Sequence, residues 1–224
     1  AEVDQLMTAA QYEAFLAKVK ADLESDLATH DIQDRTTLQS YYTTLQSIAM
    51  LQGRFDDALA FIDQIRELET KEAQKLMTGV SLRAVVAAKK AGADAAGEAA
   101  LKKSLDTNLR ALPWDKIREI ITARKGQMEI VTPELIQGQL QSGLDPVVAA
   151  TNGEISGDIA RQLVQIGSTL RVVLPYRKPM VEVMTALIAD NATAAKDIWA
   201  ERSVTLGESD KLAPVVVGVW DSGR

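Results

Sequence analysis

Apolar residues recur at helical spacing along most of residues 1–203, with charged and polar residues between them. A first helix is predicted after Thr8, which together with Gln11 forms a capping box. Its apolar face consists of Tyr12, Phe15, Leu16, Val19, Leu23 and Leu27. A stripe of this kind, with polar residues on the other side, is typical of a helix that packs on a protein core.

The same spacing predicts further helices, separated by glycine, proline and capping residues. They cover residues 34–52, 55–68, 71–91, 94–112, 114–126, 133–140, 156–173, 180–188 and a short segment after Thr193. In the helix over 156–173 the apolar stripe consists of Ile159, Leu163, Ile166, Leu170 and Val173. Pro175 and Pro179 predict a break before the next helix. The predicted fold class is therefore all-α, either an antiparallel helical bundle or a short stack of helical hairpins.

One segment near the C-terminus departs from the helical pattern. From Leu212 the chain reads Leu-Ala-Pro-Val-Val-Val-Gly-Val-Trp, a largely β-branched run that predicts a single C-terminal β-strand. Residues 204–211 before it are mainly polar and predict a linker. We therefore expect a helical N-terminal domain over 1–203, a linker over 204–211 and the start of a second domain over 212–224.

The predicted strand leads directly into Asp221-Ser222-Gly223, and this run resembles the first catalytic motif of the subtilisin-like serine proteases. The resemblance implies that Asp221 is the catalytic triad aspartate, which orients the histidine and stabilises its charged form. The family's histidine and serine motifs do not occur in this sequence, whose one histidine is His30.

The chain alone should therefore be inactive. We expect it to be the non-catalytic N-terminal region, a pro-region or docking region, of a secreted subtilisin-like serine endopeptidase, truncated after the first triad motif. From the residues alone, Asp-Ser-Gly is equally explained as an ordinary turn after a strand.

A second resemblance lies in the predicted helix pair over 42–70, which is similar to one tetratricopeptide repeat. Gly53, Phe55 and Ala58 match the glycine, aromatic and small residues of that repeat. The pattern departs at Gln46, Ile65 and Thr70, and no second copy follows at the repeat's period of about 34 residues. An ordinary antiparallel helical hairpin explains the same residues. The alternative function is thus a tetratricopeptide-like protein–protein interaction module without enzymatic activity, which would grip a peptide on an exposed helical face.

Composition narrows the function classes further. The net charge is −6, and neither a basic stripe with interleaved aromatic residues nor an apolar run of about 18 residues occurs, so we expect neither nucleic acid nor membrane as a partner. Cysteine is absent and His30 has no second histidine beside it, so no metal or other cofactor is expected. The acidic pairs Glu24/Asp26 and Asp56/Asp57 are assigned to solvated helix faces.

The expected partners are proteins or peptides, among them the cognate protease domain. An apolar strand without a neighbour in its own chain tends to fray or to pair with another molecule. We therefore expect the C-terminal strand to be disordered, to fold back on the helices, or to form a homodimer by pairing with the strand of a second copy. The sequence begins with Ala1 rather than methionine, which fits either the removal of a signal peptide or a chain shortened artificially at its start, and we adopt the first interpretation. This interpretation places the protein in the periplasm or outside the cell.

Overall fold

The computed structural model describes residues 9–92 and 94–192, together with residues 204, 205, 207, 211, 213 and 218. Every regular element in this part of the chain is helical, which confirms the all-α prediction. Contacts divide the chain into two units, Ala1–Asn191 and Ala192–Arg224. The predicted β-strand is not seen: of residues 212–224 only Ala213 and Gly218 are described, and neither lies in a strand. Thr8 and Thr193, the two predicted caps, fall outside the described residues.

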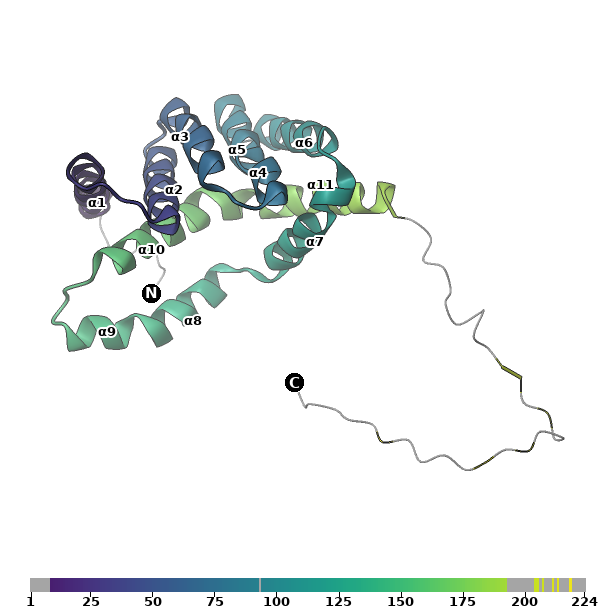
Figure 1. Cartoon of the computed structure of the whole chain (residues 1–224). Coiled ribbons are helices and arrows are strands. Elements are labelled where there is room, and N and C mark those ends of the chain that lie inside the picture. Colours follow the sequence, from purple (N-terminus) through teal and green to yellow (C-terminus); the bar gives the residue numbers. More distant parts are fainter. Residues whose placement is uncertain are drawn as a thin grey trace. The chain divides into compact units, whose positions relative to one another are not determined.

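The helices of the first unit follow one another with short connections (Figure 1). In chain order they are α1 (Ala9–Thr29), α2 (Arg35–Leu51), α3 (Phe55–Leu68), α4 (Glu72–Met77), α5 (Val80–Ala91), α6 (Ala95–Arg110), α7 (Trp114–Ile130), α8 (Pro133–Gly143), α9 (Asp145–Ala150), α10 (Gly157–Ser168) and α11 (Arg177–Asp190). A π-helical turn, η2 (Thr169–Val173), and a 3-10 turn, η3 (Leu174–Tyr176), join α10 to α11.

Helices α2 to α7, here called the hairpin stack, contain two closely packed antiparallel pairs, α2 with α3 and α5 with α6. Ala58 of α3 is completely buried, and Gln46 of α2 donates a hydrogen bond to its backbone carbonyl over 3.3 Å. The rings of Tyr42 and Phe61 also meet across this pair, with centroids 6.2 Å apart. The predicted helical hairpin is therefore present, and the polar Gln46 fits between the helices because its amide finds a backbone acceptor.

Apolar side chains of the described helices gather in two clusters. The larger extends from α2 to α7 and includes side chains of η2 and α11; its members include Leu101, Leu109, Ile117, Ile121 and Met180, each at most 1% exposed. The smaller joins α1, α2 and α10 and includes Leu16, Leu23, Leu45, Ile48 and Val164. The helical run from α10 to α11 passes below α2 to α6 in Figure 1 and contributes side chains to both clusters.

The predicted break at Pro175 and Pro179 is wrong, because the chain stays helical through both prolines. Pro175 lies in the 3-10 turn η3, and Pro179 lies in the first turn of α11. The first backbone N–H groups of a helix have no acceptor within that helix, so a proline there removes no hydrogen bond.

Three other predicted boundaries also need correction. The helix expected over 71–91 is divided at Gly79, which has a left-handed φ of +84°. A Cβ added at this position would lie 2.7 Å from the side chain of Ile62. The helix expected to end at Gly126 continues to Ile130, since an interior glycine costs only about 1 kcal/mol. After the turn at Leu144 the chain forms a short helix, α9, that was not predicted.

Candidate functional site

Asp221, the predicted catalytic residue, lies outside the described residues, so its surroundings do not enter the description of the site. The described part of the chain contains no group of three or more His, Asp or Glu side chains placed to hold a metal ion. None of its helices is both long and apolar enough to cross a membrane.

The acidic pairs singled out in the sequence engage in local surface contacts. Glu24 pairs with Lys20 at 2.7 Å, and Asp56 pairs with Lys90 at 2.8 Å. Asp57 pairs with Arg54, and Asp26 accepts a hydrogen bond from the Tyr41 hydroxyl over 2.8 Å. His30 is exposed, with its Nδ1 atom 2.9 Å from the Thr29 hydroxyl. These side chains stabilise helix ends and helix contacts and do not converge on one site.

The helical face of α2 that would be open in an isolated hairpin is covered by α10. Val164 of α10 is fully buried in the cluster that contains Ile48 of α2. Gln165 donates a weak hydrogen bond of 3.4 Å to the hydroxyl of Thr44, which is itself fully buried. The part of this face around Thr44 and Ile48 is therefore closed to a peptide.

A second apolar face of α10 points away from α2. It consists of Ile159, Leu163 and Ile166 and continues to Leu170 in η2, and all of these residues are half-buried. Their spacing of four, three and four residues is that of an amphipathic helix face. This is the stripe predicted from the sequence, but it does not form the contact with α2.

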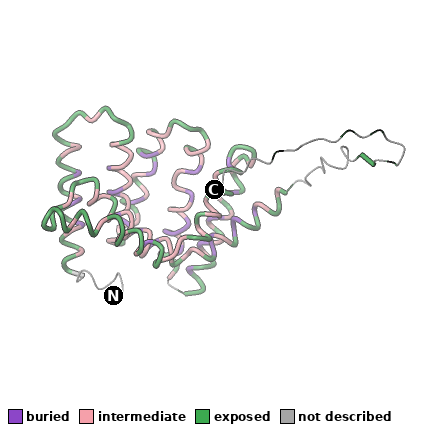
Figure 2. Tube along the Cα trace, turned by 90° about the horizontal axis from the view of Figure 1, so that it is seen from below, coloured by how far each residue is buried: buried purple, intermediate pink, exposed green. Residues whose placement is uncertain are grey.

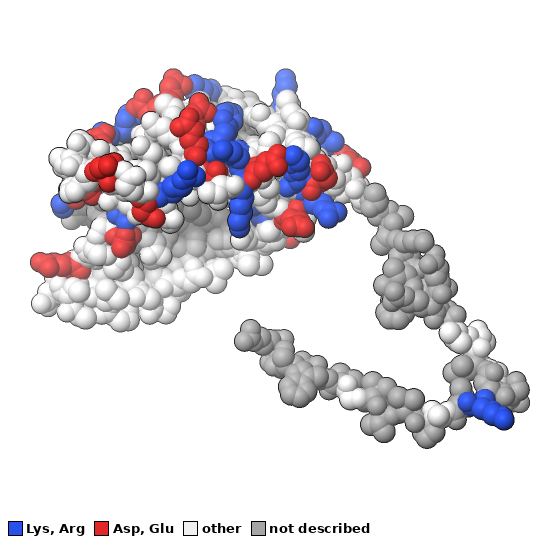
Figure 3. Space-filling view, viewed as in Figure 1, with Lys and Arg blue, Asp and Glu red and all other residues white. Residues whose placement is uncertain are grey.

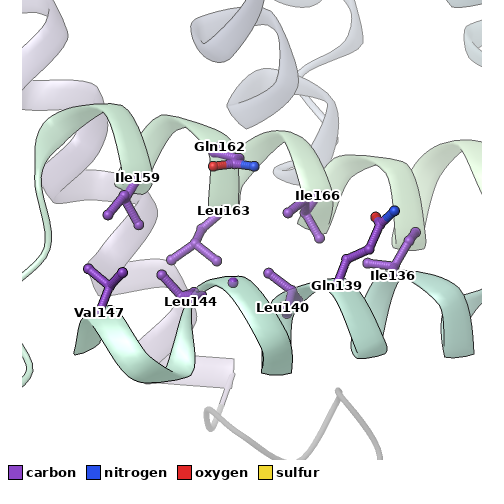
Figure 4. Close-up of a pocket in the computed structure, with 10 residues that line it drawn as sticks. Ile136, Gln139, Leu140, Leu144, Val147, Ile159, Gln162, Leu163 and Ile166 are labelled. Atoms are coloured by element: carbon purple, nitrogen blue, oxygen red, sulfur yellow. The ribbon is translucent and has the colours of Figure 1, made fainter. Parts of the chain in front are cut away.

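The arm formed by α8 and α9, residues 133–150, faces this stripe. Its own apolar side chains are Ile136, Leu140, Leu144 and Val147, and they point toward Ile159, Leu163 and Ile166 of α10 (Figure 4). The two stripes run in opposite directions, with Val147 opposite Ile159 and Ile136 nearest Ile166. A cavity of about 260 Å³ lies between them, so the arm and α10 are not packed as tightly as a core helix pair.

A larger hollow of about 580 Å³ opens beside this cavity, between α1, α10 and the loop that follows the arm. We call it the groove; its lining includes Tyr12, Phe15, Lys18, Val19, Asp22, Leu140, Ile155, Ala160, Leu163, Ile166, Gly167, Leu170 and Arg171. Leu140, Leu163 and Ile166 line both hollows, which makes them neighbouring parts of one depression along α10. A volume of this size lies within the range of ligand-binding pockets.

Charged groups along the groove are partnered within the chain. Lys18 pairs with Asp22 at 3.1 Å on α1, and the Arg171 guanidinium lies 4.2 Å from the centre of the Tyr12 ring. Residues 135–144 of the arm include no charged side chain at all. Figure 3 shows the contrast, with charges crowded over the upper helices and a broad uncharged surface below them. Most residues of α8 and α9 are exposed or half-buried (Figure 2).

The Tyr12 hydroxyl is buried at the edge of the groove and has no hydrogen-bond partner among the described residues. Burial raises the pKa of Tyr12, an effect that Arg171 partly opposes and Glu13 reinforces. The hydroxyl rests against Gly167, where an added Cβ would come within 2.1 Å of the oxygen. A residue larger than glycine at 167 would therefore displace the tyrosine ring and reshape the groove.

The groove is the feature that the sequence analysis missed. The stripe of α10 was recognised, but its spacing gives no information on which neighbour covers it. The opposite side of the same helix carries Val164 and Ser168, which are both buried. These two residues are the signal that could have indicated a second contact face. A helix with two buried faces lies between two layers, and a layer that packs loosely leaves a groove.

Comparison with known proteins identifies no relative: no family model, no curated protein and no solved structure matches the chain. The groove is therefore assigned from its geometry alone, and the role of Asp221 rests on its sequence motif alone.

Proposed function

We propose that this chain comprises the non-catalytic, helical docking region of a secreted subtilisin-like serine endopeptidase and the strand that carries its catalytic aspartate, Asp221. The observation that carries the proposal is the run from Val215 to Gly223, an apolar segment ending in Asp-Ser-Gly. A carboxylate at the end of a β-branched strand is a common way to position a catalytic aspartate on a parallel sheet. The histidine and serine of the triad would then come from chain beyond residue 224.

The helical unit supports the docking part of this proposal. Within its described residues the acidic side chains and His30 are spread over separate surface contacts. The groove is mainly apolar and open, and the charged side chains beside it already contact other side chains of the unit. Such a surface is suited to binding a protein or peptide rather than to acid–base chemistry.

Expression of the longer natural chain with Asp221→Asn tests the catalytic assignment. A triad aspartate keeps the histidine in the productive tautomer, so kcat for a peptide substrate should fall by about 10⁴. Asp210→Asn, at the nearest other aspartate in the sequence, is the matched control and should leave kcat unchanged. An open reading frame without histidine and serine motifs after residue 224, or a variant at position 221 that hydrolyses normally, contradicts the protease proposal.

The second candidate is a protein–protein interaction module with no enzymatic role. It is favoured by the hairpin of α2 and α3, whose Gly53, Phe55 and Ala58 occupy the positions of a tetratricopeptide-like unit. A gene that encodes no catalytic domain, together with retained peptide binding by the helical unit, would support this candidate over the first.

A further inference from the structure

We propose that the groove along α10 binds one amphipathic helix of a partner protein, through an apolar face that carries no charge. The inference rests on the proposed function only in that the helical unit docks a protein. It adds the position of the docking site and the chemistry of the segment that occupies it.

The length of the groove suits a helix. Its floor extends from Gly157 to Arg171, which at 1.5 Å per residue corresponds to about 21 Å. This equals about four turns of a bound helix, enough for anchors at positions i, i+4, i+7 and i+11. The apolar residues of the floor, Ala160, Leu163, Ile166 and Leu170, cover about 15 Å of this length at spacings of three or four residues.

The walls come from different elements. Phe15 and Val19 of α1 form one wall, and Leu140 of the arm forms part of the other. Val19 is already buried, but Phe15 and Leu140 are half-buried. A bound leucine or isoleucine would remove their remaining apolar surface from water, which contributes about 25 cal/mol per Å². The cavity between the arm and α10 gives the arm room to move onto the occupant.

The charged side chains around the groove indicate which kind of partner fits it. Lys18 is paired with Asp22, and Arg161 at the near end of α10 is paired with Asp158. Arg171 stacks on Tyr12 at the other end, and the arm is uncharged from 135 to 144. An acidic peptide or a phosphate-bearing partner would have to break these pairs, whereas an uncharged helix face leaves them intact. The complementary partner is therefore a helix with leucine-like anchors and neutral polar neighbours.

A designed peptide is the direct probe. It has about 16 residues, with leucine at the a and d positions of a heptad and glutamine, serine and alanine elsewhere, and carries a fluorophore. Fluorescence anisotropy with the 224-residue chain should give micromolar affinity. The Kd should change by less than about threefold between about 0.05 and about 0.5 M salt, because no ion pair forms. A matched peptide with lysine at two of the leucine positions should not bind.

Two groove variants and one control localise the binding. Leu163→Gln on the floor and Leu140→Gln on the arm should each weaken the peptide by about tenfold or more, as expected for central anchors. Ile130→Gln changes an apolar residue that is 68% exposed and does not line the groove, and it should leave the affinity within about twofold. Circular dichroism of each variant checks that its helices are intact.

Three results would overturn the proposal. The first is no binding of the leucine peptide at about 1 mM. The second is an equal affinity for wild type and for folded Leu163→Gln and Leu140→Gln variants. The third is light scattering that shows a dimer whose groove is closed to the peptide, which would make a second copy of this chain the occupant. Loss of peptide binding leaves the Asp221 assay unaffected, so failure here and failure of the protease assignment are separable.

Discussion

The hairpin stack and the arm are built from helices of similar amphipathic character, yet they differ in packing and in charge. In the stack, Leu101 and Ile117 are completely buried, and ion pairs such as Lys116–Glu72 at 2.6 Å link one helix to another. In the arm, Leu144 is half-buried and Val147 is 40% exposed. No charged side chain lies between residues 135 and 144.

This difference in packing means that the apolar stripes of the two regions have different roles. In the stack each stripe is filled by side chains of neighbouring helices, so its burial contributes directly to folding free energy. In the arm and on the groove face of α10 the stripes face each other across a cavity. Part of their apolar surface is therefore not yet buried and remains available to a binding partner. Substitutions at matched leucines should therefore have unequal effects on stability.

The largest effect is expected for Leu101→Ala in α6. This side chain is 0% exposed in the larger cluster, so its removal leaves a cavity and should lower the free energy of unfolding by about 2–5 kcal/mol. Urea denaturation measures the change as a lower midpoint at constant slope. A loss below about 1 kcal/mol would mean that the stack is no better packed than the arm.

Leu140→Ala, the matched leucine of the arm, should cost about 1 kcal/mol or less. The side chain borders both hollows and is half-buried, so few contacts are lost and no new closed cavity forms. The same urea titration provides the comparison. Native-state hydrogen exchange should meanwhile show faster exchange over 133–150 than over α6, in wild type as well as in the variant. Equal protection from hydrogen exchange in residues 133–150 and in α6 would contradict the proposed difference in packing between the arm and the stack.

A pair of tyrosines gives the smallest expected effects. The Tyr41 hydroxyl donates a hydrogen bond of 2.8 Å to Asp26, which ties α2 to α1, and Tyr41→Phe should cost about 0.5–1.5 kcal/mol. Tyr12→Phe is the matched control, because the Tyr12 hydroxyl is buried without a partner and its loss should be neutral or slightly stabilising. Thermal unfolding of both variants measures the difference, and a larger loss for Tyr12→Phe would show that its hydroxyl has a partner after all.

Much of the fold could be predicted from the sequence because local signals agree with the packing. The helices predicted over 133–140 and 156–173 begin within one residue of the expected positions, since the side-chain oxygens of Thr132 and Ser156 accept hydrogen bonds from the first turns. The split at Gly79 could not be predicted, because a glycine inside an apolar pattern is tolerated in a helix. The close approach of Ile62, which leaves no room for a Cβ at this position, comes from a different helix and is not visible in the local sequence.

The candidate site was predicted only in part. The stripe Ile159, Leu163, Ile166 and Leu170 was found, but spacing alone cannot distinguish a stripe facing a core from one facing a groove. That distinction depends on how close the arm approaches, and the arm is joined to α10 by a loop through Asn152 and Gly153, both with positive φ. Asp221 rests on its motif and stays a prediction.

The helical run from α10 through η2 and η3 to α11 has a consequence for how this unit unfolds. Val164 near its start belongs to the smaller cluster, and Met180 and Leu187 near its end belong to the larger. Neither cluster can come apart without freeing one end of this shared helix, so melting of one weakens the other. We expect the helical unit to unfold in a single cooperative transition, and we expect the arm to open at a lower temperature than this transition.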